Sequence, residues 1–442
     1  MSIAVEAQPE GGLLASLLSE ERFYPSAPTS IEQTDLSPSV VEGLICKYVS
    51  IAGTASGRDI ADHICLPFGV LEDLYRTLRS RQILCHTGAA PLNDYFYKLT
   101  DQGQERTQTF MDACSYCGPA PVQLNEYIVS VEAQTIRAEA PKRPELEAAF
   151  ADILVPPELV GSLGPVVNSA AGCFLYGAPG NGKSTVARRL TACFGQHVWI
   201  PHTIIEDNQI IKLYDPAYHQ EVVGEADRLL SSSAHDRRWV KVKRPTVIVG
   251  GELTMDGLEI RHDPRSNVSE APLQMKSNCG SLLIDDFGRQ RIEPRELLNR
   301  WIVPLESGFD LLTLPTGKKI QVPFEQLILF STNLKPDDLV DEAFLRRIPY
   351  KIHVTDPDEK EFHKLFEMSA EQFKCENRRE VVDYVLAKHY RSQNRPLRRC
   401  HPRDLLMQVR NYCVFQDLPV EMRPEYFDYV ATSFFTNVCD SQ

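Results

Sequence analysis

Residues 177–184, which read GAPGNGKS, constrain the fold of this 442-residue chain more than any other segment. They match the pattern GxxxxGK[ST] and lie between the apolar run GCFLY and the helix-forming run STVARRLTACF. In a strand–loop–helix context, glycines let backbone amides turn toward phosphate oxygens, and the N-terminus of the helix adds partial positive charge. The segment therefore predicts a nucleotide phosphate site made by Gly177, Ala178, Pro179, Gly180, Asn181, Gly182, Lys183, Ser184 and Thr185.

Three side chains of this loop have different expected roles. Lys183 is expected to reach the β- and γ-phosphates and the Ser184 hydroxyl to coordinate Mg²⁺, whereas Thr185 is a secondary contact. A loop of this kind would also suit a kinase or a GTPase, so the use of the nucleotide depends on residues further along the chain.

Polar side chains end two later apolar runs. SLLIDDF, residues 281–287, predicts a strand followed by Asp285 and Asp286, and QLILFSTNL predicts a second strand followed by Asn333. We expect Asp285 to hold Mg²⁺, Asp286 to orient or deprotonate the attacking water, and Asn333 to bind that water or the γ-phosphate. Each run taken alone would also fit a strand that ends in an ordinary polar turn.

Two arginine-containing segments complete the set. DEAFLRRIPYKIHV places Arg346 and Arg347 at the end of a predicted helix, from which a guanidinium can reach a nucleotide in a neighbouring subunit. RRCHPRDLLMQV starts a helix at Pro402 and places Arg403 in its first turn. The alternatives are a helix-dipole role for Arg347 and a surface ion pair for Arg403.

The order of these motifs resembles the AAA+ ATPase family from about residue 140 to residue 440. The resemblance implies an α/β fold with a P-loop parallel sheet, a helical lid, ATP and Mg²⁺ as cofactors, and a ring-like homo-oligomer, with a hexamer expected. It assigns Lys183 and Ser184 to Walker A, Asp285 and Asp286 to Walker B, Asn333 to sensor 1, Arg346 or Arg347 to the arginine finger, and Arg403 to sensor 2. The family usually has Asp-Glu at Walker B, whereas this sequence has Asp285-Asp286, so we expect a different position of the water, slow turnover, or a glutamate supplied from elsewhere.

The chain between Lys183 and Asp285 is longer than a compact ATPase core needs, and a second inserted segment precedes the strand that ends at Asn333. RPTVIVGGELTMDGLEIRHD and FDLLTLPTGKKIQVPF each predict a hairpin, the second one turning at residues 315–317. Such insertions resemble the AAA+ branch of MoxR-type chaperones, magnesium chelatase and enhancer-binding activators, in which hairpins engage the substrate. The alternative is a pair of hairpins that decorate a sheet edge.

The N-terminal region predicts three helices, in SPSVVEGLICKYVSIAG, SGRDIADHICL and PFGVLEDLYRTLRSRQIL, followed by a strand and a helix in DYFYKLTDQGQERTQTFM. This order resembles a winged-helix domain of the α+β class, whose third helix would present Arg76, Arg79 and Arg81 to DNA. Glu72 and Asp73 flank that cluster and the net charge is −13, so a protein-docking module is the alternative.

These patterns suggest a flexible tail at 1–36 that contains GLLASLL, a winged-helix-like domain at 37–118, a linker at 119–145, the ATPase core at 146–355 and the lid at 356–442. Cys114 and Cys117 have the spacing of half a zinc site, and no second pair completes it. No apolar run approaches the ~20 residues of a membrane span, so we expect a cytoplasmic protein.

The function expected from the sequence is ATP hydrolysis at subunit interfaces that remodels a macromolecular target, with an unknown protein as the favoured target. Two alternatives stay open: a DNA-acting regulator or loader that uses the N-terminal domain, and a nucleotide-gated scaffold with little hydrolysis.

Overall fold

The computed structural model describes residues 22–195, 197–222, 235–339 and 345–435, and its contacts divide the chain into two compact units. Unit 1 comprises Met1–Ala140, Phe194–Leu282 and Glu296–Leu327, and unit 2 comprises Pro141–Cys193, Leu283–Arg295 and Ile328–Gln442. The GLLASLL segment lies outside the described residues. The residues of the predicted ATPase core are therefore shared between two units.

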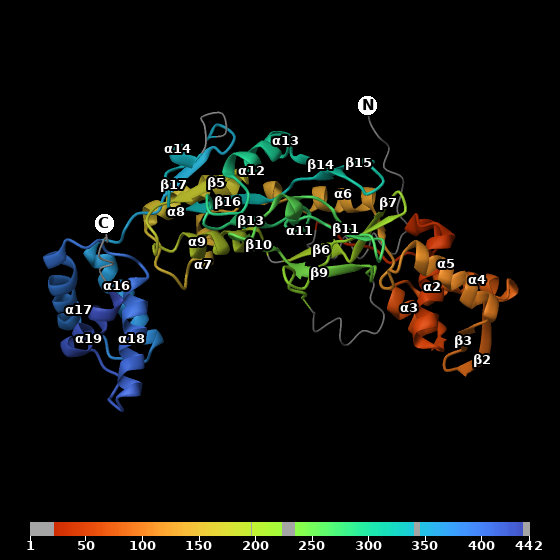
Figure 1. Ribbon diagram of the computed structural model, residues 1–442, viewed down its shortest axis with the longest axis horizontal. Coiled ribbons are helices and arrows are strands. Elements are labelled where there is room, and N and C mark those ends of the chain that lie inside the picture. Colours follow the sequence, from red (N-terminus) through yellow and green to blue (C-terminus); the bar gives the residue numbers. More distant parts are fainter. Residues whose placement is uncertain (1–21, 196, 223–234, 340–344, 436–442) are drawn as a thin grey trace. The chain divides into compact units, whose positions relative to one another are not determined.

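A five-stranded sheet carries the glycine-rich loop at the end of its β5 strand (Figure 1). The strand order is β10 (Thr246–Val249), β13 (Ser281–Ile284), β16 (Leu327–Thr332), β5 (Cys173–Tyr176) and β17 (Tyr350–His353). Strand β5 pairs in parallel with both β16 and β17. Because β13 and β16 are buried along their whole length, they read as continuous apolar runs, as expected for a parallel sheet covered on both faces. The predicted α/β fold class is confirmed.

Helices α7 (Arg143–Ala149) and α8 (Pro157–Ser169) precede β5, and α9 (Lys183–Leu190) is the first helix after it. Helices α12 (Pro294–Arg300) and α13 (Ile302–Ser307) follow β13, and α14 (Pro336–Leu339) follows β16.

The C-terminal region is helical, as predicted (Figure 1). Its helices are α16 (Glu359–Gln372), α17 (Arg379–Val385), α18 (His401–Phe415) and α19 (Pro424–Phe434), with a π-helical segment at Leu386–Tyr390. Asp358 caps α16 by accepting the backbone N–H of Glu361. Phe362 and Phe366, one turn apart on that helix, are fully buried in a core shared by all four helices.

The N-terminal part of unit 1 contains the predicted helices and strand in the predicted order. Helices α2 (Pro38–Ala52), α3 (Gly57–Ile64) and α4 (Phe68–Ser80) precede β2 (Leu84–Ala90), β3 (Asp94–Leu99) and α5 (Asp101–Ala113). Strand β3 lies between β2 and the short β1 (Ala55–Ser56) in an antiparallel sheet. Ser56 and Asp59 form a capping box at the start of α3, which explains why this short helix begins there.

The rest of unit 1 is rich in strands, and the long insertion after α9 supplies most of them. One sheet has the order β11 (Arg261–Asp263), β12 (Val268–Glu270), β8 (Gln209–Lys212), β7 (Thr203–Glu206) and β4 (Val122–Gln123). Strand β6 (His197–Pro201) pairs with β9 (Trp239–Lys243). Helices α6 (Leu124–Ala133) and α11 (Leu273–Lys276) accompany these strands.

One predicted hairpin is wrong and the other is confirmed. Strand β10 is an edge strand of the five-stranded sheet, the following Met255–Leu258 is a 3-10 helix, and β11 pairs with β12 instead. Val247 and Val249 of β10 are buried, so that run is a core strand. In contrast, β14 (Phe309–Thr313) and β15 (Lys319–Pro323) form the predicted antiparallel hairpin. One face of the hairpin is buried in the core of unit 1 through the side chains of Leu312, Leu314, Ile320 and Val322.

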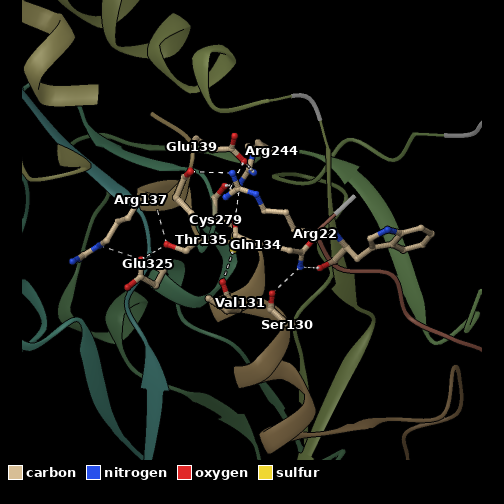
Figure 2. Close-up of polar contacts among 12 residues, drawn as sticks. Arg22, Ser130, Val131, Gln134, Thr135, Arg137, Glu139, Arg244, Cys279 and Glu325 are labelled. Carbon is tan, nitrogen blue, oxygen red and sulfur yellow. Dashed lines mark hydrogen bonds and ion pairs between the residues drawn. The ribbon is translucent and has the colours of Figure 1, made fainter. Parts of the chain in front are cut away.

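The described part of the predicted tail and residues 119–140 of the predicted linker belong to unit 1, whereas residues 141–145 belong to unit 2. Helix α6 lies within the linker and buries Leu124, Tyr127 and Val131, which share one helix face. Figure 2 shows how Arg244 joins this region to the insertion: it donates to the carbonyl oxygens of Gln134 (3.1 Å) and Cys279 (2.7 Å) and to Glu139 (3.0 Å). Arg22, within the predicted tail, donates to the Ala138 carbonyl oxygen at 2.9 Å.

Candidate nucleotide site

The glycine-rich loop has the backbone shape that a phosphate cradle requires. Gly180 and Gly182 have φ of 82° and 80°, in the left-handed region that favours glycine. Gly182 is the N-cap of α9, so the helix begins at Lys183 and its free backbone amides face the loop. The local sequence therefore places an anion-binding helix terminus at the carboxyl end of β5.

Lys183 lies inside this cradle. Its side chain is nearly buried, and its Nζ donates to the carbonyl oxygens of Gly177 and Ala178, both at 3.0 Å, and to Asn333 Oδ1 at 2.8 Å. Burial lowers the pKa of Lys183, while the nearby carboxylates of Asp286 and Asp285 act in the opposite direction. The ammonium is thus held by neutral acceptors that phosphate oxygens can replace.

Ser184 and Asp285 form the predicted metal-binding pair. Ser184 Oγ donates to Asp285 Oδ1 at 2.6 Å, which joins the first turn of α9 to the end of β13. A hydroxyl and a carboxylate at this separation fit Mg²⁺, which prefers oxygen ligands and keeps several of its waters. The residues present therefore suit the ion that a nucleoside triphosphate carries.

Asn333 bridges Lys183 and Asp286. Its Oδ1 accepts from Lys183, and its Nδ2 donates to Asp286 Oδ1 at 3.3 Å. Asp286 has φ of 51° and is exposed, so its carboxylate is available to solvent. The structure thus brings together five predicted residues, Lys183, Ser184, Asp285, Asp286 and Asn333, at the carboxyl ends of adjacent strands.

A cavity of about 950 Å³ opens over these residues, within the size range of small-molecule sites. The loop, Asp286 and Asn333 line it together with the apolar residues Ile153, Leu154, Val155, Pro156, Leu159, Leu365 and Met368. The cavity therefore offers polar groups for phosphates and apolar groups for a base, all within unit 2.

The side chain of Asn181 makes its contacts within the protein. Its side chain is 1% exposed, donates to Asp356 Oδ1 at 2.6 Å and accepts the backbone N–H of Arg399 at 3.3 Å. The Cys400 N–H donates to the Gly180 carbonyl oxygen at 2.9 Å, and Arg398 forms an ion pair with Asp356. The side chain of Asn181 thus ties the loop to the segment before α18.

The predicted arginines occupy different positions. Arg403 lines the cavity, but it pairs with Asp404 at 2.9 Å and is 61% exposed. Arg346 is exposed and Arg347 is half-buried, and the cavity lining described above contains neither of them. Sequence reasoning missed Arg289 and Arg399, which also line the cavity. No sequence pattern marks either residue, although Arg289 closely follows the pair Asp285-Asp286.

The arginines of α4 are mostly engaged with carboxylates. Arg76 pairs with Glu72 and Asp73, and Arg81 pairs with the buried Glu42 at 2.8 Å. Only Arg79 lacks a hydrogen bond or ion pair to the described residues. This pairing reduces the positive charge that the helix could offer to DNA.

Cys117 Sγ lies 3.5 Å from His63 Nε2, and no group of three or more His, Cys, Asp or Glu residues in the described ranges could hold a metal ion. None of the helices that the structure describes is long and apolar enough to cross a membrane.

A family model described as a domain of unknown function, DUF8689, matches residues 358–433, and no curated protein matches the sequence. Among solved structures, the chain is similar to NtrX from Brucella abortus, with 13% identity over 66% of this chain and 58% of that chain and a TM-score of 0.40. It is also similar to a mutant form of Thermotoga maritima RuvB, with 12% identity over 66% of this chain and 74% of that chain and a TM-score of 0.39. A third similar structure is domain III of the Thermotoga maritima replication initiation protein DnaA, with 12% identity over 66% of this chain and 98% of that chain and a TM-score of 0.37. The chain thus spans less than two thirds of the NtrX chain.

Proposed function

We propose that this chain is a magnesium-dependent ATP hydrolase of the AAA+ type. The observation that carries the proposal is the bridge made by Asn333, which joins the loop lysine Lys183 to Asp286 in the lining of one cavity. A site that only binds phosphate needs the loop alone. The additional carboxylate and amide are the groups that position a water for attack on a terminal phosphate.

Each residue of the site has a separate role in binding ATP or in its hydrolysis. Lys183 leaves its carbonyl acceptors and binds the phosphate chain, while backbone amides at the start of α9 bind further phosphate oxygens. Ser184 and Asp285 hold Mg²⁺, which supplies charge neutralisation on the phosphates. Asp286 accepts a proton or hydrogen bond from the attacking water, and Asn333 holds the Asp286 carboxylate in place.

The proposal includes assembly. Arg346 is exposed, as expected of a side chain that acts on the nucleotide of a neighbouring subunit in a ring. Within its own subunit, Arg403 lies at the cavity and can leave Asp404 for the phosphates. We propose a homo-oligomer, with a hexamer as the expected form.

A protein is the favoured target of the proposed motor. Ion pairs with Glu72, Asp73 and Glu42 engage two of the three α4 arginines, which favours protein docking over DNA binding by this helix. The winged-helix-like domain then serves as the recruitment module.

Phosphate release tests the proposal directly. Full-length protein is assayed with Mg²⁺ and ATP over a range of protein concentrations, beside Lys183→Ala, Arg346→Ala/Arg347→Ala and the control Arg188→Ala, an exposed residue on the same helix as Lys183. We expect specific activity to rise with concentration, to disappear in the first two variants and to persist in the control. Wild-type protein that binds ATP but matches Lys183→Ala at every concentration would instead be a nucleotide-gated scaffold.

A further inference from the structure

Arg289 is the cation at the cavity that no described side chain engages. Four cationic residues line the cavity: Lys183, Arg289, Arg399 and Arg403. Arg399 is held by Glu361 at 2.8 Å and Arg403 by Asp404, whereas the exposed Arg289 side chain makes no hydrogen bond or ion pair within the described ranges. An exposed guanidinium that lines a cavity and has no partner among the described residues is free to bind an anion.

The turn that carries Arg289 is firmly built. The Arg289 N–H donates to the Asp286 carbonyl oxygen at 3.0 Å, and Gly288 at φ 102° completes the reversal of the chain. Gln290 closes the turn, because its Nε2 donates to the Asp285 carbonyl oxygen and its Oε1 accepts the Gly288 N–H, both at 2.8 Å. The position of Arg289 is therefore tied to the two aspartates.

Phe287 attaches the same turn to the sheet. Its backbone N–H donates to the Ser331 carbonyl oxygen at 2.7 Å, and its buried ring packs on Phe174 and Phe330. These contacts fix the turn against β5 and β16. Arg289 thus lies in a turn whose backbone is held against the sheet.

Arg289 lines the same cavity as Asp286 and Asn333, and it follows Asp286 by three positions in the turn described above. The proposed roles of Asp286 and Asn333 place the terminal phosphate beside these two residues. Negative charge is spread over the oxygens of that phosphate during transfer, so a cation close to Asp286 would act there together with Lys183.

We propose that Arg289 binds the γ-phosphate from within the same subunit and so makes the site distinguish ATP from ADP. The inference rests on the proposed ATP site. A planar guanidinium can donate two parallel hydrogen bonds to phosphate oxygens, which a lysine cannot reproduce. ADP lacks the group that Arg289 contacts.

The test is equilibrium binding of the β,γ-imido analogue of ATP, which resists hydrolysis, and of ADP to full-length protein with Mg²⁺. Arg289→Ala is compared with Arg291→Ala, an exposed arginine two positions along that does not line the cavity described here. We expect Arg289→Ala to weaken the ATP analogue by about 10- to 100-fold, the range of a hydrogen bond to a charged group, and to change ADP little. Arg289→Lys should recover only part of the loss, and Arg291→Ala should match wild type.

Equal losses for the two nucleotides, or no loss for either, would overturn the assignment. Arg289→Gln repeats the measurement if the alanine variant loses its fold in a circular-dichroism melt. Wild-type protein that binds neither nucleotide, with Lys183→Ala indistinguishable from it, would show that the proposed ATP site itself is wrong.

Discussion

Replacement of Gly180 by alanine tests whether the loop and the segment before α18 fit together as closely as the structure indicates. A Cβ at position 180 would lie 2.7 Å from Cys400 Sγ, and Gly180 has φ of 82°. Two separate costs are therefore expected, backbone strain and steric overlap. The chain also contains a matched control, because Gly182 has φ of 80° and its added Cβ would meet nothing within 4 Å.

The expected losses of stability follow from backbone strain and steric overlap. A left-handed backbone costs a non-glycine residue about 1–2 kcal/mol, which is the whole expected effect of Gly182→Ala. Overpacking adds about 1–3 kcal/mol, so Gly180→Ala should cost about 2–5 kcal/mol. Burial raises the pKa of the Cys400 thiol to about 11, so the thiol is neutral. Cys400→Ala removes the sulfur that the added Cβ would meet, and with it the hydrogen bond between the thiol and Asp404. In the double variant the overlap should vanish, leaving the about 1–2 kcal/mol of strain.

The assay must report on unit 2. Its readout is hydrogen exchange of peptides that cover β5 with α9 and of peptides that cover α18, measured without nucleotide. The tryptophans Trp199, Trp239 and Trp301 all lie in unit 1, so their fluorescence during urea unfolding is an internal control. Faster exchange should appear in both peptide groups of Gly180→Ala. Equal effects of Gly180→Ala and Gly182→Ala, or no rescue by Cys400→Ala, would refute the close fit.

Three further predictions concern other parts of the molecule. Leu314→Ala, at a position 2% exposed in the β14–β15 hairpin, should cost unit 1 about 2–5 kcal/mol in urea unfolding. Lys318→Ala, which breaks an exposed ion pair with Glu206 at the tip, should change the unfolding little. Similar small values for both would mean that the hairpin does not pack. Burial lowers the pKa of His202 to about 4, below its unfolded value of about 6.5, so its contribution to stability is present above pH ~6.5 and is lost as the pH falls toward 4. His202→Gln should flatten that dependence in acid titrations of tryptophan fluorescence, and an unchanged profile would exclude His202 as its source. Asn333→Ala should lower phosphate release about 100-fold while ATP binding persists, and an unchanged rate would remove the bridge from the mechanism.

The polar groups of the site were predictable because their signals are local. The glycine pattern, the strand before it and the polar residues that end two buried strands are all visible within short windows, and parallel strands bring their carboxyl ends together. Asn181 could not be assigned in this way. Its partner Asp356 is far along the chain, so no local pattern distinguishes a side chain that binds phosphate from one that binds the next segment.

The error at β10 has a different physical cause. TVIV is a short apolar run, and such a run fits either an arm of a hairpin or a buried strand of a parallel sheet. In the part of the predicted tail that the structure describes, Phe23 and Tyr24 pack against Trp239 and Trp199, contacts that the composition of the tail does not reveal. Aromatic contacts between residues far apart in the sequence form only in the folded chain, so the sequence around the tail does not predict them.

The contacts of the glycine-rich loop indicate which segment would respond first to a conformational change caused by nucleotide binding. Phosphate binding requires the loop amides and Lys183 to turn toward the ligand, and the neighbouring Gly180 carbonyl and Asn181 side chain already hold Cys400 and Asp356. A shift of the loop therefore acts directly on the start of α18 through hydrogen bonds. The β14–β15 hairpin is in a different situation, because Leu312 and Leu314 fix it in the core of its own unit. We expect nucleotide to alter hydrogen exchange in α18 at lower occupancy than in the hairpin, and the opposite order would favour a motor that acts through the hairpin.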